Sequence, residues 1–107
     1  MEFWRRIKNL KGNTLRTLFK GKPFDIVDIS DNAIIIRPHH KNKKRVIQRK
    51  EIEGAHKELF ALGHISRSEI EARHALRNPA YVAALLAEEE GVIYTNRPIV
   101  LRIHKRI

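Results

Sequence analysis

Apolar residues recur at helical spacing over residues 51–90, where the periodic pattern of the chain is clearest. The first stripe consists of the apolar residues Ile52, Ala55, Leu59, Phe60 and Leu62 together with His56. Gly63 follows this stripe, and glycine is the usual residue where a helix ends in the left-handed conformation. The pattern therefore predicts a helix over about residues 51–62.

A second helix is marked by its start signal. Ser66 and Glu69 have the spacing of a capping box, in which the serine oxygen accepts a hydrogen bond from an N–H of the first turn. The glutamate in turn accepts a hydrogen bond from the N–H of the serine. This helix is expected to cover about residues 66–76.

A third helix is predicted to start at Asn78-Pro79. Asparagine would cap this helix, and proline would take the first helical position, where no N–H is needed. Gly91 is the stop signal, so the helix is expected over about residues 79–90. Its inward-facing residues would be Tyr81, Val82, Leu85 and Leu86. The short connection to the second helix requires these two helices to pack on each other.

The N-terminus carries a shorter helical pattern. Phe3, Trp4, Ile7 and Leu10 form an apolar stripe with basic residues beside it, and Gly12-Asn13 ends the pattern. A basic amphipathic segment of this kind can lie on a membrane surface. We favour packing in the protein core instead, because about ten residues bury little area and a small domain needs its large apolar side chains.

Strands are predicted between these helices. β-branched and aromatic runs occupy Phe24–Ser30, Ala33–Arg37 and Arg45–Arg49, and together they predict a three-stranded antiparallel meander. Residues 33–36, AIII, lack polar alternation, which indicates a strand covered on both faces. Residues 14–20 match neither period, so a strand and an irregular segment both stay open there.

The C-terminal residues predict a second hairpin. The runs GVIYT and IVLRI flank a turn at Asn96-Arg97-Pro98, and a basic tail of His104, Lys105 and Arg106 follows. A length of 107 residues favours a single domain of the α+β class. Residues 1–50 would supply the short helix and the meander, and residues 51–107 the three helices and the hairpin.

Positive charge is concentrated in the first half of the chain. The formal net charge is +10; residues 1–50 hold 14 Lys and Arg against 4 Asp and Glu, and residues 51–107 hold 8 of each class. Such a surface attracts nucleic acid, an anionic membrane or an acidic protein. The plainest alternative is a basic protein whose charge serves only solubility.

The most basic segment runs from Arg37 to Lys50. It contains no acid, and its cations are Arg37, Lys41, Lys43, Lys44, Arg45, Arg49 and Lys50. These residues could simply form a solvated hairpin tip. Like charges on one loop repel each other, however, and an anionic ligand would relieve this repulsion. We therefore expect contacts to a phosphate backbone, which supply affinity and not sequence preference.

The sequence shows no pattern typical of an active site. Its histidines lack metal-ligand spacing, and Asp25, Asp28 and Asp31 are not followed by the glutamate–lysine pair of a metal-dependent nuclease. It also lacks a glycine-rich phosphate loop and a serine elbow. We expect a protein that is not an enzyme and that uses no cofactor or metal.

The compartment is predicted from what the sequence lacks. It has no cysteine, no apolar run near the ~20 residues of a membrane span, and no signal-peptide core. These features favour a soluble, cytoplasmic protein without a membrane partner.

The predicted elements of the second half resemble a winged helix-turn-helix domain over about residues 51–104. The resemblance is carried by ISRSEI and by NPAYVAALLAEEEGVIY, in which the third helix leads into a strand. It implies a DNA-binding module whose third helix enters the major groove. Carried over by position, it places Arg77, Asn78 and Tyr81 against bases, Arg67 near phosphate, and Arg97 at the tip of the wing.

The sequence departs from this family where bases would be read. Residues 51–90 hold 4 basic and 8 acidic residues, and the third helix offers almost nothing that pairs with base edges. Winged helices also serve in protein interaction or dimerisation. We therefore expect a small nucleic-acid-binding protein that contacts phosphates mainly through Arg37–Lys50, with duplex DNA favoured over RNA.

Two alternatives stay open. One is an adaptor or regulator that docks an acidic protein surface. The other is an RNA-binding module, which would require exposed aromatic rings for stacking on unpaired bases. Tyr94 and Phe24 are the candidates for such rings, but both lie in predicted strands and are expected in the core.

Overall fold

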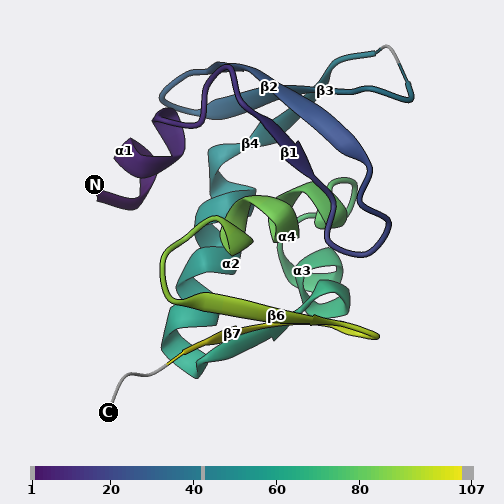
Figure 1. Ribbon diagram of the computed structural model, residues 1–107. Coiled ribbons are helices and arrows are strands. Elements are labelled where there is room, and N and C mark those ends of the chain that lie inside the picture. The colour runs from purple at the N-terminus through teal and green to yellow at the C-terminus, as the bar shows by residue number, and fades with distance from the viewer. Residues whose placement is uncertain (1, 42, 105–107) are drawn as a thin grey trace.

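The computed structural model describes residues 2–41 and 43–104. Over these residues the chain forms four helices and two antiparallel sheets, which confirms the α+β class (Figure 1). Asn42 of the predicted basic loop, and Lys105 and Arg106 of the predicted tail, lie outside the described residues. In chain order the elements are α1 (Glu2–Lys8), β1 (Thr14–Arg16), β2 (Pro23–Ile29), β3 (Ala33–Pro38), β4 (Arg45–Gln48), α2 (Arg49–Leu62), β5 (His64–Ser66), α3 (Arg67–Arg73), α4 (Pro79–Ala87), β6 (Val92–Asn96) and β7 (Ile99–Ile103).

The first sheet has the order β1-β2-β3-β4. Strands β2, β3 and β4 form the predicted meander, and β1 adds a fourth strand, with Leu15 opposite Phe24. The segment 14–20, which the sequence left open, is therefore a strand followed by a turn. Its three paired residues are too few to display a period, so only the pairing with β2 defines the strand.

The prediction that β3 is covered on both faces is wrong. Ile34 and Ile36 are fully buried, whereas Ala33 and Ile35 on the opposite face are partly exposed. Successive side chains of a strand point to opposite faces, and the helices cover only one face of this sheet. An uninterrupted apolar run is thus compatible with a sheet covered on one side.

The second sheet has the order β5-β7-β6. The predicted hairpin is present as β6 and β7, and it is joined by β5, which the sequence did not reveal. Strand β5 has three residues and is held by long-range pairing, with Ile65 opposite Leu101. A strand defined by a partner so far away in the chain leaves no local pattern.

The long helix α2 begins two residues earlier than predicted. Its first residue is Arg49, because the N–H of Gln48 donates to Glu51 Oε2 at 2.8 Å and so caps the start. Arg49, expected at the end of a strand, therefore lies in the first turn of the helix. The predicted stop is confirmed: Gly63 has a φ of 84°, and its N–H donates to the Leu59 oxygen at 2.8 Å.

The capping box of α3 is confirmed. The N–H of Glu69 donates to Ser66 Oγ at 3.0 Å, and the N–H of Ser66 donates to Glu69 Oε1 at 2.9 Å. Helices α3 and α4 both end earlier than predicted, at Arg73 and Ala87. Beyond each helix end the backbone hydrogen bonds no longer have the spacing of an α-helix. After α4, for example, the N–H of Glu88 donates to the oxygen of Leu85, three residues earlier, at 3.2 Å.

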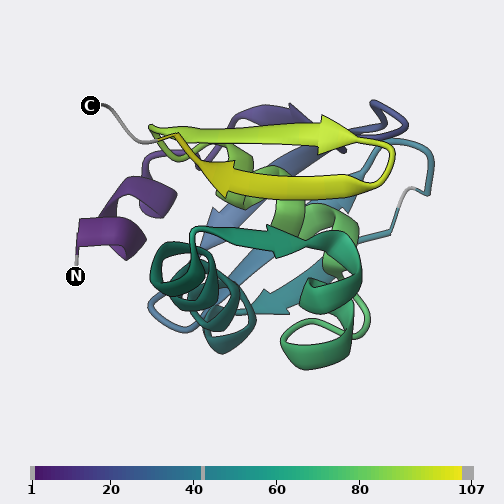
Figure 2. The same ribbon diagram turned by 90° about the horizontal axis from the view of Figure 1, so that it is seen from below.

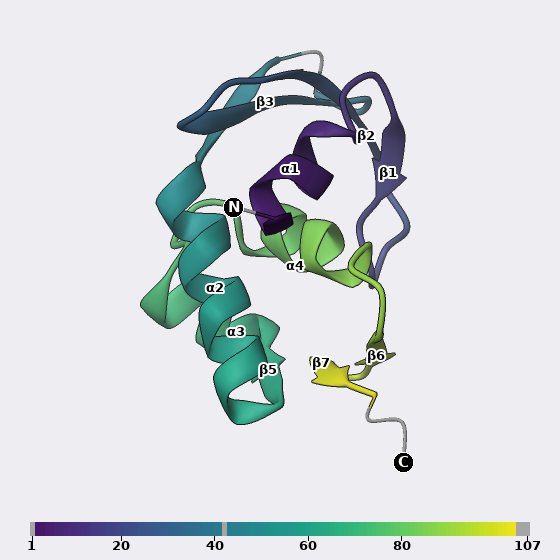
Figure 3. The same cartoon turned by 90° about the vertical axis from the view of Figure 1, so that its left-hand side faces the viewer.

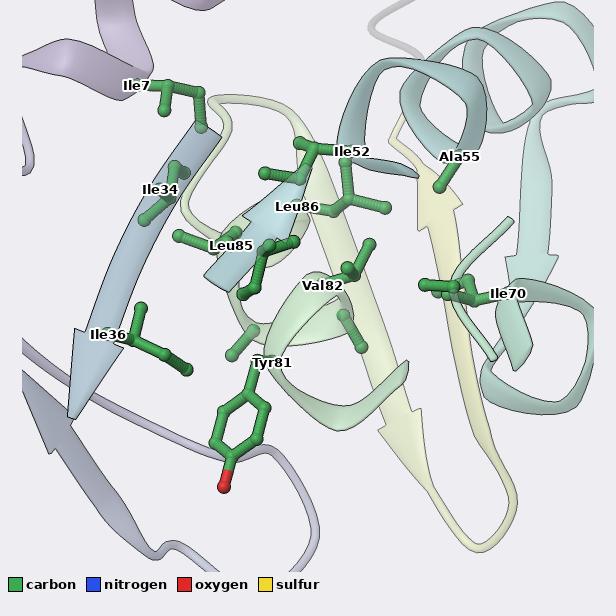
Figure 4. Close-up of a cluster of buried hydrophobic side chains, with 14 of the residues drawn as sticks. Ile7, Ile34, Ile36, Ile52, Ala55, Ile70, Tyr81, Val82, Leu85 and Leu86 are labelled. Carbon is green, nitrogen blue, oxygen red and sulfur yellow. The ribbon is translucent and has the colours of Figure 1, made fainter. Parts of the chain in front are cut away.

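Helix α4 lies in the centre of the molecule, between the four-stranded sheet and the β6–β7 hairpin, with α2 and α3 beside it (Figure 3). Its residues Tyr81 to Leu86 are all buried. In Figure 4, Leu85 lies close to Ile34 on the sheet side, while Val82 faces Ile70 on the helix side. The helix is thus apolar all round because both sides are covered by protein.

The N-terminal helix packs in the core, as we favoured. Phe3, Trp4 and Ile7 are each no more than 3% exposed. The Trp4 indole N–H donates to the Ser30 oxygen at 3.1 Å, and the Phe3 ring stacks on His56 with 3.7 Å between ring centroids. Helix α1 therefore joins the β2–β3 turn to α2.

Replacing Ser66 with alanine is expected to lower the free energy of unfolding by about 1 kcal/mol, because it leaves an N–H of the first turn of α3 without its acceptor. Denaturant unfolding measures this change. Ser68→Ala, an exposed serine in the same helix, is the matched control and should have less than half of this effect. Equal stabilities of the two variants would contradict the capping assignment.

Candidate nucleic-acid interface

Four connections of the chain converge at one end of the molecule. These are the loops β1–β2, β3–β4 and α3–α4 and the turn β6–β7, which lie at the right-hand side of both Figure 1 and Figure 2, away from the termini. We call this surface the basic end, and it consists of Lys20, Lys22, Lys41, Lys43, Lys44, Arg45, Arg77 and Arg97. All of these side chains are exposed except Arg45, which is half-buried.

Among the described residues, the cations of the basic end have no acidic partner. Within residues 2–41 and 43–104, none of the eight lies within ion-pair distance of a carboxylate. Their charge is therefore not neutralised by the protein, and it is available to an anion in solution.

A cavity of about 520 Å³ lies within the basic end. Its walls come from the β1–β2 loop, the starts of α3 and α4, and the β6–β7 turn. The charged or titratable side chains that line it are Lys20, Lys22, His40, Arg67, Arg77 and Tyr81. No Asp or Glu is found among the described residues of its wall. The charged side chains of the lining are thus cations, of which Arg67 pairs with Glu71.

Arg37 is not part of the basic end, because it pairs with Asp25. Asp25 accepts hydrogen bonds from Thr14 at 2.6 Å and Arg37 at 3.3 Å, and its Oδ1 lies 2.7 Å from His39 Nε2. The hydroxyl of Thr14, followed by His39 and Arg37, lowers the pKa of Asp25 to about 2. The charge of Arg37, which we expected to contact phosphate, is therefore largely neutralised by a carboxylate from the neighbouring strand.

Arg49 also lies outside the basic end. Its guanidinium stacks over Trp4 at 4.8 Å, donates to the Asp31 oxygen at 2.8 Å and pairs with Glu53 at 3.0 Å. It therefore has a structural role between α1, the β2–β3 turn and α2. Lys50 is exposed in the first turn of α2 and is not a lining residue of the cavity.

Arg45 joins the two halves of the chain. Its Nη2 donates to the Arg77 oxygen at 3.0 Å, and its guanidinium lies 5.7 Å from the centre of the Tyr81 ring. This contact holds the β3–β4 loop next to the α3–α4 loop. One surface therefore contains both the lysines of the β3–β4 loop and Arg77. The lysines were predicted from the charge of their segment, and Arg77 from the winged-helix resemblance.

Asn78 and Tyr81 do not lie where the family resemblance placed them. Asn78 is 6% exposed, and its Nδ2 donates to the Val46 oxygen at 3.4 Å and to Glu51 at 3.3 Å instead of capping α4. Tyr81 is 9% exposed and meets the Phe24 ring edge to face at 5.1 Å. The first sheet covers the start of α4, so the expectation that these two residues face bases is wrong.

Arg67 and Arg97 have different surroundings. Arg67 lines the cavity and pairs with Glu71, 3.2 Å away, one turn along α3. Arg97 is exposed at the β6–β7 turn, and its guanidinium lies 5.6 Å from the centre of the Phe19 ring. Both residues lie at the surface, and Arg97 has no carboxylate partner among the described residues.

Sequence reasoning missed Phe19, Lys20, Lys22 and His40. Phe19 is 50% exposed and lines the cavity, although a large apolar residue in a small protein would be expected inside. Partial desolvation and the charges of Lys22 and Lys41 lower the pKa of His40. The available signal was the run FKGK, in which two lysines flank a turn glycine beside an aromatic residue.

The acids of α2 and α3 are occupied by partners of their own. Glu58 accepts hydrogen bonds from Arg73 and lies 2.8 Å from His74 Nε2, and Arg73 lowers the pKa of Glu58. Glu89 pairs with Arg6 of α1. The excess of acids over residues 51–90 therefore lies mainly away from the cavity and does not cancel the charge of the basic end.

Two further features bear on function. No helix in the described part of the chain is long and apolar enough to cross a membrane. Among the same residues, no group of three or more His, Asp or Glu side chains is placed to hold a metal ion.

The chain matches no protein-family model, no curated protein and no solved structure at a significant level.

Proposed function

We propose that this protein binds nucleic acid through its basic end, chiefly by contacts to phosphates. The observation that carries the proposal is the gathering of eight cations, seven from four connections of the chain and Arg45 from the start of β4. None of them has an acidic partner among the described residues. Charges that repel each other raise the free energy of the folded state, and a polyanion relieves this repulsion. Phosphate contacts of this kind give affinity that depends little on sequence.

The second half of the chain supports a more specific proposal about the fold. The order α2, β5, α3, α4, β6 and β7 fits a winged-helix-like unit over residues 51–104. In such a unit α4 would be the helix that enters the major groove. Since α4 is covered on both sides, we propose that this protein uses the unit as a scaffold for its loops and does not read bases with α4.

Binding is expected to weaken steeply with salt, because each neutralised phosphate releases condensed counterions. For duplex DNA the slope of log K against log salt is about −0.9 for each phosphate contact, so five to eight contacts give a slope between about −4.5 and −7. Fluorescence anisotropy with a labelled DNA duplex, between about 50 and 200 mM salt, measures this slope.

The same series distinguishes the other candidate partners. Labelled single-stranded DNA and RNA of equal length, added under the same conditions, show which form of nucleic acid is preferred. If the partner is an acidic protein, none of these oligonucleotides should bind measurably near physiological salt. That result, or binding that is flat with salt, would contradict the proposal.

A further inference from the structure

We propose that the cavity of the basic end receives one unpaired nucleotide of a single strand, whose base stacks on Phe19 and whose phosphate is held by Lys20, Lys22 and Arg77. This inference rests on the proposed nucleic-acid binding and specifies its form. A volume of about 520 Å³ falls within the range of small-molecule sites, about 300 to 1,000 Å³. Bases of an intact duplex are stacked inside it and cannot enter such a cavity.

The cavity combines two kinds of surface that a nucleotide needs. Its cations match the phosphate, and its apolar wall, which includes Phe19, Pro79 and Ile99, matches the flat face of a base. Inorganic anions require only the first kind. Proteins that bind single strands use this same pairing of a positive groove with aromatic stacking platforms.

Phe19 is the side chain that favours a base. Half of its surface is exposed, and the Arg97 guanidinium lies over its ring at 5.6 Å. This contact holds the ring at the cavity without enclosing it. A base can therefore stack on the aromatic surface that remains exposed, and the stacking depends little on which base it is.

Asn78 belongs to the wall of the cavity and is not assigned a contact with the base. It lines the cavity, is 94% buried, and its Oδ1 has no hydrogen-bond partner among the described residues. Its Nδ2 is occupied by two acceptors, which fixes the orientation of the amide. Because this oxygen has almost no accessible surface, a base bound in the cavity would not reach it.

The lysines of the β3–β4 loop explain why a strand, and not a free nucleotide, is proposed. Lys41 lies next to His40, which lines the cavity, and Lys43 and Lys44 continue the positive surface beyond it. Phosphates that neighbour the bound nucleotide would meet these lysines. A free nucleotide would use only the cavity.

The test uses the full-length protein and labelled oligonucleotides of about 12 nucleotides, single-stranded DNA, single-stranded RNA and a blunt DNA duplex. Phe19→Leu keeps the apolar volume but removes the aromatic face. It is expected to weaken binding of both single strands by about 5- to 150-fold and to change duplex binding less than twofold. Phe60→Leu, which replaces a similarly exposed ring on α2 outside the cavity, is the matched control and should change neither.

Two additional measurements support the same reading. Fluorescence of a 2-aminopurine base in the single strand should be quenched on binding to the wild type and to Phe60→Leu, and much less on binding to Phe19→Leu. Lys20→Gln with Lys22→Gln, both at exposed positions, should lower the single-strand salt slope by about 1.4. Adenosine 5′-monophosphate should displace the strand only in large excess, and displacement at equal concentration would overturn the assignment to a strand.

The outcomes separate this inference from the proposed function. Salt-dependent binding with equal affinities of Phe19→Leu and wild type for single strands would overturn the stacking inference and leave nucleic-acid binding intact. Absence of binding to every oligonucleotide at low salt would overturn both. Circular dichroism confirms that each variant is folded before its affinity is compared.

Discussion

Replacing Lys41, Lys43 and Lys44 with glutamine is expected to weaken nucleic-acid binding by about 100-fold near physiological salt. The three side chains are exposed, lie on one loop of the basic end and have no acidic partner in the described part of the chain. Each lost phosphate contact should lower the salt slope by about 0.9 for a duplex, so the triple variant should lose nearly three units. The loss should be the same for every sequence, since backbone contacts carry no sequence information.

Arg45 is left intact in this variant for a structural reason. It donates to the Arg77 oxygen and lies over Tyr81, so its removal would disturb the contact between the β3–β4 loop and the start of α4. The three lysines have no such contacts among the described residues. Their replacement should therefore leave the unfolding midpoint nearly unchanged, as is usual for exposed positions.

A matched control tests whether position or net charge matters. Arg5, Lys57 and Arg102 are exposed cations on α1, α2 and β7, away from the cavity. Their replacement with glutamine removes the same total charge, yet it should change affinity only slightly, through the long-range field. If both triple variants lose affinity equally, the basic end is not the binding surface and the attraction belongs to the protein as a whole.

Local signals in the sequence located most elements. The capping box at Ser66, the stop at Gly63 and the apolar runs of β2 and β3 depend on residues close to one another in the chain. The sequence did not predict the elements that depend on pairing with residues far away in the chain. β5 exists because Ile65 pairs opposite Leu101, and β1 because Leu15 pairs opposite Phe24.

The candidate site illustrates the same limit. The sequence suggested the β3–β4 loop and the winged-helix positions as competing binding surfaces. The packing of the first sheet over α4 brings Lys41, Lys43 and Lys44 to the same end as Arg77, while it buries Asn78 and Tyr81. Arg37 pairs with Asp25 of the adjacent strand, because the strand register places the two residues opposite each other. None of these relations is visible in residue spacing.

The second large effect concerns stability and follows from the central place of α4. Leu85 is 1% exposed and contributes to the core shared by the sheet and the helices (Figure 4). Leu85→Ala is expected to lower the free energy of unfolding by about 2 to 5 kcal/mol, because a rigid core closes only partly over the space left behind. Small domains have only about 5 to 15 kcal/mol in total, so the variant should be close to its folding limit. Leu76→Ala, at a position that is 74% exposed, is the control and should change stability by less than about 0.5 kcal/mol.

The same variant tests whether residues 1–50 and 51–107 unfold together as one domain. Trp4, the single tryptophan, packs beside the first sheet and reports on that part by fluorescence, whereas far-UV circular dichroism reports mainly on the helices. Since α4 is covered by the sheet on one side and by α2 and α3 on the other, both signals should shift to the same lower midpoint in Leu85→Ala. If the Trp4 transition keeps its wild-type midpoint while the helical signal shifts, the sheet does not depend on α4. The single-domain expectation would then be wrong, and the basic end would be formed by two units that fold separately.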